Sequence, residues 1–480
     1  MKKCYLLSLL AAASVAGCTV GPDYARPSAE VPAAYKEGFA WQPAQPRDHE
    51  SRGNWWAAFS DPQLDALLAQ VNVSNQTLVA AEAQFRQAVA LADTARAAWY
   101  PTATVGLSET RSRPSGTTGA VIGQPTSKRT IWSMPFNASW EADVWGKVRR
   151  SVEAGEASAQ ASAADLENAR LSIQSQLAQN YFQVRAVDAQ KQLLADTVAA
   201  YAKSMELTNN RYKMGVVARI DVAQAEAQLK STQAQLLDLG VQRAQLEHAI
   251  AVLLGKAAGN FALVAEPLTA VPPPVPAGLP AELLERRPDI AAAERRVVAA
   301  NAQVGVAKAA WFPSATLSAT YGFQTATAAQ WFTLPSRFWS IGPALAETIF
   351  DGGKRQAASD QAVAAYDASV ANYRQAVLTA FQEVEDNLAA LRILEEEAQV
   401  QGEAVKASQL ALEYSLNQYK AGIATYLQVV TAQATALSNQ RTAADLLARR
   451  VTASVLLVKA LGGGWDASAL PKDKALTGKK

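Results

Sequence analysis

Histidine, cysteine and methionine are scarce in this chain of 480 residues. Histidine occurs only at His49 and His248, cysteine only at Cys4 and Cys18, and methionine four times. So few metal-binding or nucleophilic side chains provide no catalytic set, and no glycine-rich segment has the spacing of a phosphate loop. We therefore expect a protein that is not an enzyme and that has no cofactor and no metal site.

Charge is also sparse. Only 18% of the residues are charged and the formal net charge is +2. Neither value is typical of a protein that binds the phosphate backbone of a polynucleotide or that carries an acidic tail. We expect no nucleic-acid partner.

Proline is absent from two long stretches, residues 136–266 and 344–470. In the first, strong helix formers dominate and apolar residues recur mostly three, four or seven positions apart. This pattern predicts a helix over about Arg149 to Lys213, which is roughly 100 Å long at ~1.5 Å per residue. The two stretches turn back at Gly215 and Gly422.

The two stretches are copies of one unit. Asn210-Arg211-Tyr212-Lys213-Met214-Gly215 returns 207 positions later as Asn417-Gln418-Tyr419-Lys420-Ala421-Gly422. The chain is therefore an internal duplication. We divide it into a segment 18–62, repeat 1 (63–266), a proline-rich strap (267–288), repeat 2 (289–462) and a tail (463–480). In each repeat, two short helices stacked end to end match the length of the long one.

A period of two appears within each repeat, in residues 102–141 and 314–349. Apolar and aromatic side chains alternate there with Ser, Thr, Asn and Gly in runs of roughly 9–11 residues, the length of a transmembrane strand. Seven of the eleven tryptophans lie between Trp99 and Trp145 or between Trp311 and Trp339. We predict one β-hairpin per repeat. The edge of a soluble sandwich is the alternative, although soluble strands normally place charges on their wet face.

Four strands cannot close a barrel, and an open sheet edge in hydrocarbon costs several kcal/mol per unpaired backbone group. Two copies would give eight strands filled by side chains, whereas three would give twelve strands and a pore. The predicted fold is mainly α with transmembrane β. It is a trimeric twelve-stranded barrel, four strands per chain, continued by a long α-helical barrel.

The N-terminus has the pattern of a secretory signal peptide over residues 1–17. Its apolar run ends in Val15-Ala16-Gly17-Cys18, which resembles the bacterial lipobox and predicts lipidation of Cys18. The alternative is an ordinary cleavage site followed by an incidental cysteine.

The whole chain resembles the TolC-like outer membrane factor family, in its lipoprotein branch of NodT-type RND efflux lipoproteins. The motifs that carry this resemblance are Cys18–Tyr24, Trp55-Trp56 with Phe59 and Asp61-Pro62, Asp143–Arg149, Arg287–Ile290 and Ala309–Pro313. The resemblance implies a homotrimer in the cell outer membrane, anchored in outer membrane lipid at Cys18, with a long periplasmic extension. It also implies a periplasmic adaptor (membrane fusion) protein and an inner-membrane pump of the RND type as partners.

The function that this resemblance implies is a passive exit duct for small molecules in a tripartite efflux system. Polypeptide (type I) secretion through the same channel is one alternative, and a periplasmic coiled-coil structural lipoprotein is another. The hydroxyl-rich pore face is permissive, so the sequence does not identify a substrate.

Two sets of residues are expected to act at the periplasmic tip. The turn glycines and their apolar neighbours predict the adaptor-docking site, which consists of Gly215, Val216, Val217, Gly422 and Ile423. The family's entrance positions correspond here to Asp221, Gln428 and Thr431. Asp221 could instead simply compensate the dipole of the helix that it begins.

Overall fold

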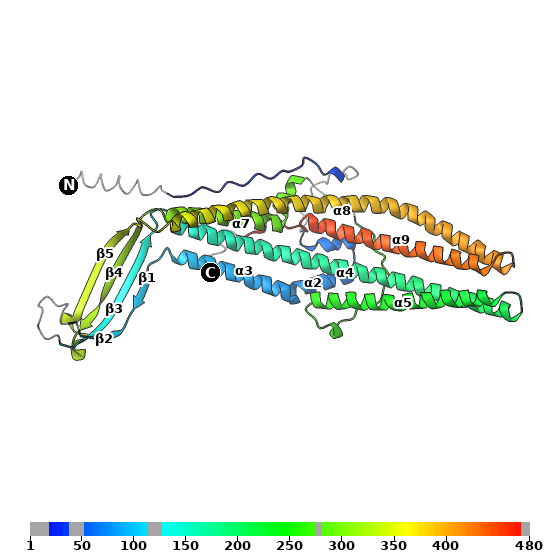
Figure 1. Cartoon of the computed structure of the whole chain (residues 1–480), viewed down its shortest axis with the longest axis horizontal. Coiled ribbons are helices and arrows are strands. Elements are labelled where there is room, and N and C mark those ends of the chain that lie inside the picture. Colours follow the sequence, from blue (N-terminus) through cyan, green and yellow to red (C-terminus); the bar gives the residue numbers. More distant parts are fainter. Residues whose placement is uncertain (1–18, 38–51, 114, 116–126, 274–279, 472–480) are drawn as a thin grey trace.

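The structure, a computed structural model, describes residues 19–37, 52–113, 115, 127–273 and 280–471. The predicted lipidation site, Cys18, lies outside these residues. The molecule is elongated, with a β-sheet at one end and helices running from it to two turns at the far end (Figure 1). Among the described residues, none of the helices has an apolar stretch sufficient to cross a bilayer.

Two helical hairpins form the length of the molecule. Each pairs a helix of 67 residues with one of 35 residues, and each element of the second hairpin begins and ends 207 positions after its counterpart in the first. At ~1.5 Å per residue the long helices extend roughly 100 Å. The hairpin helices are α4 (Lys147–Lys213), α5 (Arg219–Leu253), α8 (Lys354–Lys420) and α9 (Tyr426–Ala460).

The remaining helices pack alongside α4 and α8, on the part of these long helices nearer the sheet (Figure 1). Asp61 caps α2, because its carboxylate accepts hydrogen bonds from the amides of Gln63 and Leu64 at 3.0 and 3.1 Å and Pro62 occupies the first turn. These helices are α2 (Pro62–Ser74), α3 (Gln76–Ala97), α6 (Leu283–Arg286) and α7 (Pro288–Ala309). Short 3-10 turns are η2 (Arg52–Phe59), η3 (Ala258–Asn260), η4 (Pro280–Glu282), η5 (Ala328–Gln330), η6 (Leu334–Ser336) and η7 (Ala467–Ala469).

The short helices stack end to end, as predicted. The break between α2 and α3 falls at Asn75, whose Oδ1 caps α3 through the amides of Thr77 and Leu78. Its Nδ2 donates to the carbonyl of Leu253 at the end of α5, at 2.7 Å. The start of α3 therefore meets the end of α5, and both helices pack against the continuous α4.

The sheet is antiparallel in the order β1-β3-β4-β5, with β2 also paired to β3. β1 and β2 follow one another along the same edge of β3 and pair with it in a single register, so together they form one strand line of the sheet. The ladder is interrupted opposite Pro135, which has no N–H to donate, although its carbonyl still accepts from the Gly106 amide at 3.0 Å. The strands are β1 (Thr102–Val105), β2 (Ser108–Ser112), β3 (Arg129–Ala142), β4 (Ser314–Thr325) and β5 (Arg337–Ala346).

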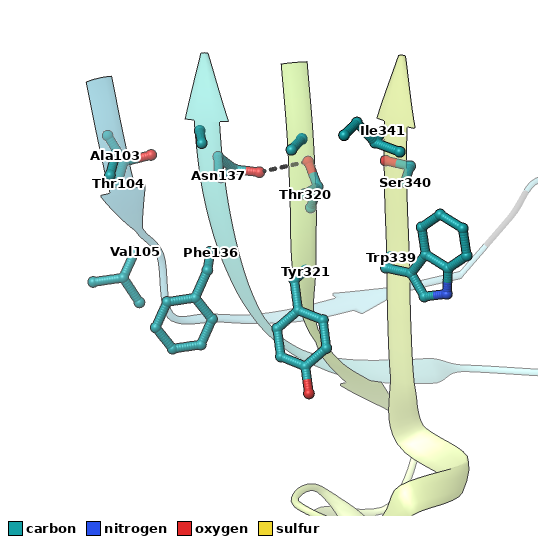
Figure 2. A pocket seen from close by; sticks show the side chains of 12 residues that line it. Ala103, Thr104, Val105, Phe136, Asn137, Thr320, Tyr321, Trp339, Ser340 and Ile341 are labelled. Carbon is teal, nitrogen blue, oxygen red and sulfur yellow. Dashed lines mark hydrogen bonds between the residues drawn. The ribbon is translucent and has the colours of Figure 1, made fainter. Parts of the chain in front are cut away.

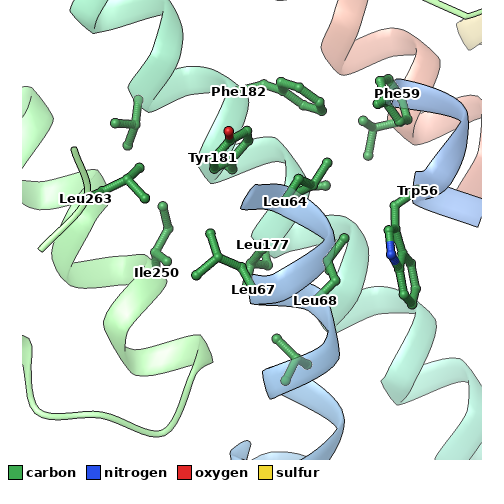
Figure 3. Packing of buried hydrophobic residues seen from close by; sticks show 14 of the residues in the cluster. Trp56, Phe59, Leu64, Leu67, Leu68, Leu177, Tyr181, Phe182, Ile250 and Leu263 are labelled. Carbon is green, nitrogen blue, oxygen red and sulfur yellow. The ribbon is translucent and has the colours of Figure 1, made fainter. Parts of the chain in front are cut away.

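The largest apolar cluster lies where α2 and η2 pack on the middle of α4 (Figure 3). Leu64, Leu68 and Leu177 are completely buried there, each contributing about 1.5–3 kcal/mol relative to exposure. Trp56 and Phe59, which belong to one of the motifs that carry the family resemblance, are part of this cluster.

The N-terminal segment 19–37 follows the outside of repeat 2. The Val20 amide donates to the carbonyl of Trp145 at 3.1 Å, at the joint between sheet and helices. Farther along, Tyr24 Oη donates to Glu294 at 3.2 Å, and the buried Tyr35 packs in the apolar cluster of α7, α8 and α9. This segment therefore extends from the sheet toward the middle of the helical part (Figure 1).

Candidate functional site

One face of the sheet is polar in every strand. Thr104, Asn137, Thr320 and Ser340 are register partners across all four lines of the sheet, and Asn137 accepts a hydrogen bond from Thr320 at 2.9 Å (Figure 2). The next polar row is Thr102, Ser139, Ser318 and Gly342. These rows carry hydroxyl and amide groups and no formal charge, so this face presents water-compatible groups without selecting the charge of a solute.

The rows between them are apolar. One consists of Val105, Phe136, Tyr321 and Trp339, and the next of Ala103, Ala138, Ala319 and Ile341. Val105, Phe136, Tyr321, Trp339 and Ile341 are all exposed in the single chain, by 45 to 73%. A soluble protein rarely exposes so large a continuous apolar face, which is typical of a surface that contacts lipid.

The far turns of the two hairpins have the same geometry. Gly215 and Gly422 have φ values of +75° and +79°, which glycine adopts at little cost. The amides of Val216 and Ile423 donate to the carbonyls of Arg211 and Gln418, both at 2.9 Å, which completes a Schellman cap on each long helix. Val216 is 58% and Ile423 80% exposed, whereas Val217 is only partly exposed and packs inward.

The tips are joined to each other by buried tyrosines. Tyr419 of α8 and Tyr426 of α9 are 2% and 1% exposed, and their ring centroids lie 5.2 Å apart. From α4, Thr208 accepts from Tyr419 Oη at 3.2 Å and Ser204 lies 3.2 Å from Tyr426 Oη. Burial is the largest cause that raises the pKa of Tyr426 above its ordinary value, so this phenol stays neutral.

Arg211 completes this contact. Its Nη1 donates at 2.5 Å to the Tyr419 carbonyl, which also accepts from the Gly422 amide at 3.1 Å in the cap at the end of α8. Its guanidinium carbon lies 4.7 Å from the centre of the Tyr419 ring. Arg211, Tyr419 and Tyr426 are not among the residues that the sequence predicts to be functional.

The predicted entrance residues lie on the returning helices near these turns. Asp221 is in the first turn of α5 and is partly buried, while Gln428 and Thr431 of α9 are exposed. Thr431 Oγ1 donates to the Leu427 carbonyl at 3.0 Å. Asp221 occupies the position equivalent to Gln428, so only one of the two hairpins offers a carboxylate here. Across the described residues, His, Cys, Asp and Glu form no group suited to holding a metal ion.

A sheet with one polar and one apolar face, joined to helices of roughly 100 Å, defines a membrane channel with a long helical extension. The family model described as outer membrane efflux protein matches residues 67–256 and 279–463. The chain belongs to this TolC-like family and is an outer membrane channel of an efflux system. Its role is transport, not enzymatic catalysis.

Individual relatives agree. The chain is 31% identical to the toluene efflux pump outer membrane protein TtgF of Pseudomonas putida, over 97% of this chain and 98% of that protein. It is 34% identical to the pyoverdine export outer membrane protein OpmQ of Pseudomonas aeruginosa, over 86% and 87%. The solved structure of the outer-membrane channel OprN superposes with a TM-score of 0.87 at 31% identity, covering 93% of this chain and all of OprN.

Proposed function

We propose that three copies of this chain close a twelve-stranded barrel in the outer membrane and form the exit duct of a tripartite RND-type efflux system. Each copy contributes repeat 1 (63–266) and repeat 2 (289–462), joined by the strap 267–288. The observation that carries the proposal is the continuous polar row Thr104–Asn137–Thr320–Ser340. Placed inside a closed barrel, it lines a water-filled pore, while the apolar rows face lipid.

The two outer edges of the sheet support oligomer closure. Among the described strands, the edge formed by β1 and β2 and the edge formed by β5 have no pairing partner on their outer sides. Unpaired backbone groups in hydrocarbon cost several kcal/mol each, so these edges require strands from neighbouring copies. Twelve strands leave an open lumen, which eight strands do not.

The helical tips support the same ring. Tyr419 of repeat 2 is buried against α4 of its own chain, while the equivalent Tyr212 of repeat 1 is 40% exposed. Because the repeats are equivalent, we infer that repeat 2 of one chain covers repeat 1 of the next in the way that repeat 1 covers repeat 2 within a chain. Tyr212 would then lie in the contact between copies.

The start of the described chain supports a lipid anchor. Val20 is bound to Trp145 at the joint between sheet and helices, on the helical side of the proposed membrane. Cys18 precedes Val20 by two residues in the sequence, which corresponds to at most about 7 Å of extended chain. A lipid on Cys18 can therefore enter the adjacent leaflet without disturbing the packed segment 19–37. Mass spectrometry of the mature N-terminus tests this proposal, and an unmodified Cys18 or a different start would contradict it.

The exposed turns are the proposed adaptor-docking site. Gly215, Val216, Gly422 and Ile423 lie at the end farthest from the sheet, and Val217 supports them from the partly buried side. Asp221, Gln428 and Thr431 follow these glycines within nine residues and would line the entrance. Relatives named for toluene efflux and pyoverdine export favour small organic molecules as cargo over a polypeptide.

The deciding experiment combines assembly with export. Native mass spectrometry of the detergent-extracted protein should give a trimer, and a monomer or dimer would overturn the barrel. Gly422→Trp should leave the trimer intact and abolish export by the reconstituted pump. Gly422→Ala is the matched control: the only atom near the added Cβ is Arg211 Nη2 at 3.8 Å, so it should assemble and export. Wild-type export by Gly422→Trp would overturn the docking site alone.

A further inference from the structure

The end of the sheet farthest from the helices is strongly cationic. Residues 106–135 and 322–339 contain one carboxylate, Glu109, and five positive side chains: Arg111, Arg113, Lys128, Arg129 and Arg337. Beyond these strand-end residues, the connecting stretches 114–127 and 326–336 contain no charged residue. The charge is therefore concentrated at the strand ends and not spread over the loops.

Two of these five cations are paired on the apolar face, and two more directly adjoin its strands. Arg111 is paired with Thr130, which alternates with Trp132 and Phe136, and Arg337 is paired with Phe323. Arg113 directly follows β2 and Lys128 directly precedes β3, so the alternation of these strands, if continued by one residue, would place both on the same face. We call Arg111, Arg113, Lys128 and Arg337 the cationic rim; all four side chains are exposed. Arg129, paired with Ser112, is on the polar face instead.

An aromatic cluster lies between the apolar rows and most of the cationic rim. Ring centroids are 5.1 Å apart for Trp132 and Trp331, 5.3 Å for Trp331 and Phe332, and 5.6 Å for Phe332 and Phe323. Tryptophan and other aromatic residues collect where acyl chains give way to headgroups. From the helices outward, this face passes from the apolar rows to an aromatic zone and then to Arg111, Arg113 and Lys128, which is the order of acyl chain, interface and headgroup. The aromatic zone also holds Arg337, opposite Phe323, and the carboxylate of Glu109, opposite Trp132.

We propose that the cationic rim binds the phosphate groups of the phosphorylated glycolipid that forms the outer leaflet. The proposal rests on the proposed barrel, in which the apolar face is the outer face. A guanidinium group can donate two parallel hydrogen bonds to two oxygens of one phosphate. Each cation near an anionic lipid surface also adds to the electrostatic attraction between protein and lipid. A lipid is the occupant because the rim lies beyond the lipid-facing rows, farther along the same strands. A soluble anion leaving the pore would instead meet Arg129, which is on the polar face.

The test compares the two faces. Wild type, Arg111→Gln/Arg113→Gln/Lys128→Gln/Arg337→Gln and Arg129→Gln are purified as trimers and titrated with bisphosphorylated lipid A in mixed micelles, and bound lipid is counted by native mass spectrometry. The rim variant should bind at least about tenfold more weakly. Arg129→Gln and wild type should bind equally. Lipid A without its phosphates should bind wild type as weakly as bisphosphorylated lipid A binds the rim variant.

Three outcomes would overturn the proposed rim. The rim variant could bind bisphosphorylated lipid A as tightly as wild type does, or Arg129→Gln could lose as much lipid binding as the rim variant does. Inorganic phosphate, at about 10 mM, could also displace the lipid. The last would indicate a site for free anions. Arg111→Gln/Arg113→Gln, which changes adjacent outward positions only, replaces the fourfold variant if that one does not assemble. Trimer mass and single-channel conductance are measured on the same samples, so a failure of the barrel is distinguished from a failure of lipid binding.

Discussion

The two repeats solve one structural problem with different side chains. In repeat 1, Asn75 donates to the Leu253 carbonyl at the end of α5; in repeat 2, Arg287 donates to the Ala460 carbonyl at the end of α9, at 2.9 Å. Leu253 and Ala460 are equivalent, 207 positions apart. The last carbonyls of a helix lack helical partners, so each stack needs a donor at its junction. The amide and the guanidinium both meet that requirement.

Both repeats have a glycine after the returning helix, Gly255 after α5 and Gly462 after α9, because another part of the backbone lies too close for a side chain. A Cβ on Gly255 would lie 2.1 Å from the Ser74 carbonyl oxygen, and one on Gly462 would lie 1.9 Å from that of Arg286. Both glycines also have positive φ, +66° and +89°. Duplication therefore preserved the backbone approach, while the chemistry of the donor was free to change.

The largest expected effect is from Gly462→Ala or Gly255→Ala. Each adds a methyl group into a carbonyl oxygen at positive φ, so we expect destabilisation of more than ~3 kcal/mol and loss of the heat-modifiable trimer on gels. The matched control is Gly215→Ala, at φ +75° but with no atom within 4 Å of the added Cβ. It should cost only ~1 kcal/mol and assemble. Equal assembly by all three variants would refute the close-approach explanation.

A smaller effect should separate the two donors. Arg287 is 6% exposed and also binds Asp289 and Glu383, at 2.6 and 2.7 Å. Arg287→Met leaves two carboxylates without their cation, so it should destabilise by ~3 kcal/mol. Asn75→Ala removes a cap and one donor and should cost ~1–2 kcal/mol. Thermal unfolding of the purified trimers measures both, and a larger loss for Asn75→Ala would reverse this order.

The tip offers a third comparison, between Arg211 and its equivalent Gln418. Arg211→Ala removes the donor to the Tyr419 carbonyl and the cation above the ring, so the tip amides of α8 should exchange hydrogen roughly tenfold faster. Gln418→Ala should leave that exchange unchanged, because the Gln418 side chain is exposed. Unaltered exchange in Arg211→Ala would show that the order of this turn does not depend on Arg211.

Much of the fold could be predicted from sequence because its signals are local. The absence of proline, the alternation in the strands and the repeat spacing indicated the hairpins, the four strand lines and the stacked helices. The side-chain environment at the tips was less accessible. Tyr212 and Tyr419 occupy the same motif, yet one is 40% and the other 2% exposed. Which face of a hairpin is covered depends on packing between repeats, and a motif shared by both repeats does not distinguish the covered copy.

The break in the hydrogen-bond ladder opposite Pro135 follows from the sequence, although the alternation of apolar and polar residues does not indicate it. A period of two reports the direction of side chains, and Pro135 preserves it by occupying a polar-face position. The missing N–H affects the ladder without changing that pattern. The partial burial of Val217 could not be predicted from the sequence either. Val216 and Val217 are the same residue type, but only Val217 packs against the tyrosine cluster.

The smallest expected effect is at the joint that begins repeat 2's long helix. Asp351 accepts from the amides of Gly353 and Arg355, both at 3.1 Å, and from Arg355 Nε at 2.8 Å. Desolvation raises its pKa, but the hydrogen bonds from Arg355 and the backbone outweigh it, so the pKa of Asp351 lies below its ordinary value. Its contribution to stability is therefore complete above the ordinary carboxyl pKa of about 3.9 and is lost as pH falls through the folded pKa.

Asp351→Asn should accordingly lower the thermal transition slightly at pH 7, by less than any junction variant. The difference from wild type should shrink as the pH is lowered below about 4, because the wild-type carboxylate then becomes protonated and loses the same charge. Asp360→Asn is the control: it lies on the same helix, and its carboxylate accepts from Gln356 within one turn at the surface. A pH-independent difference for Asp351→Asn would mean that the side chain acts through shape, and the charge of the cap would then contribute nothing to the joint.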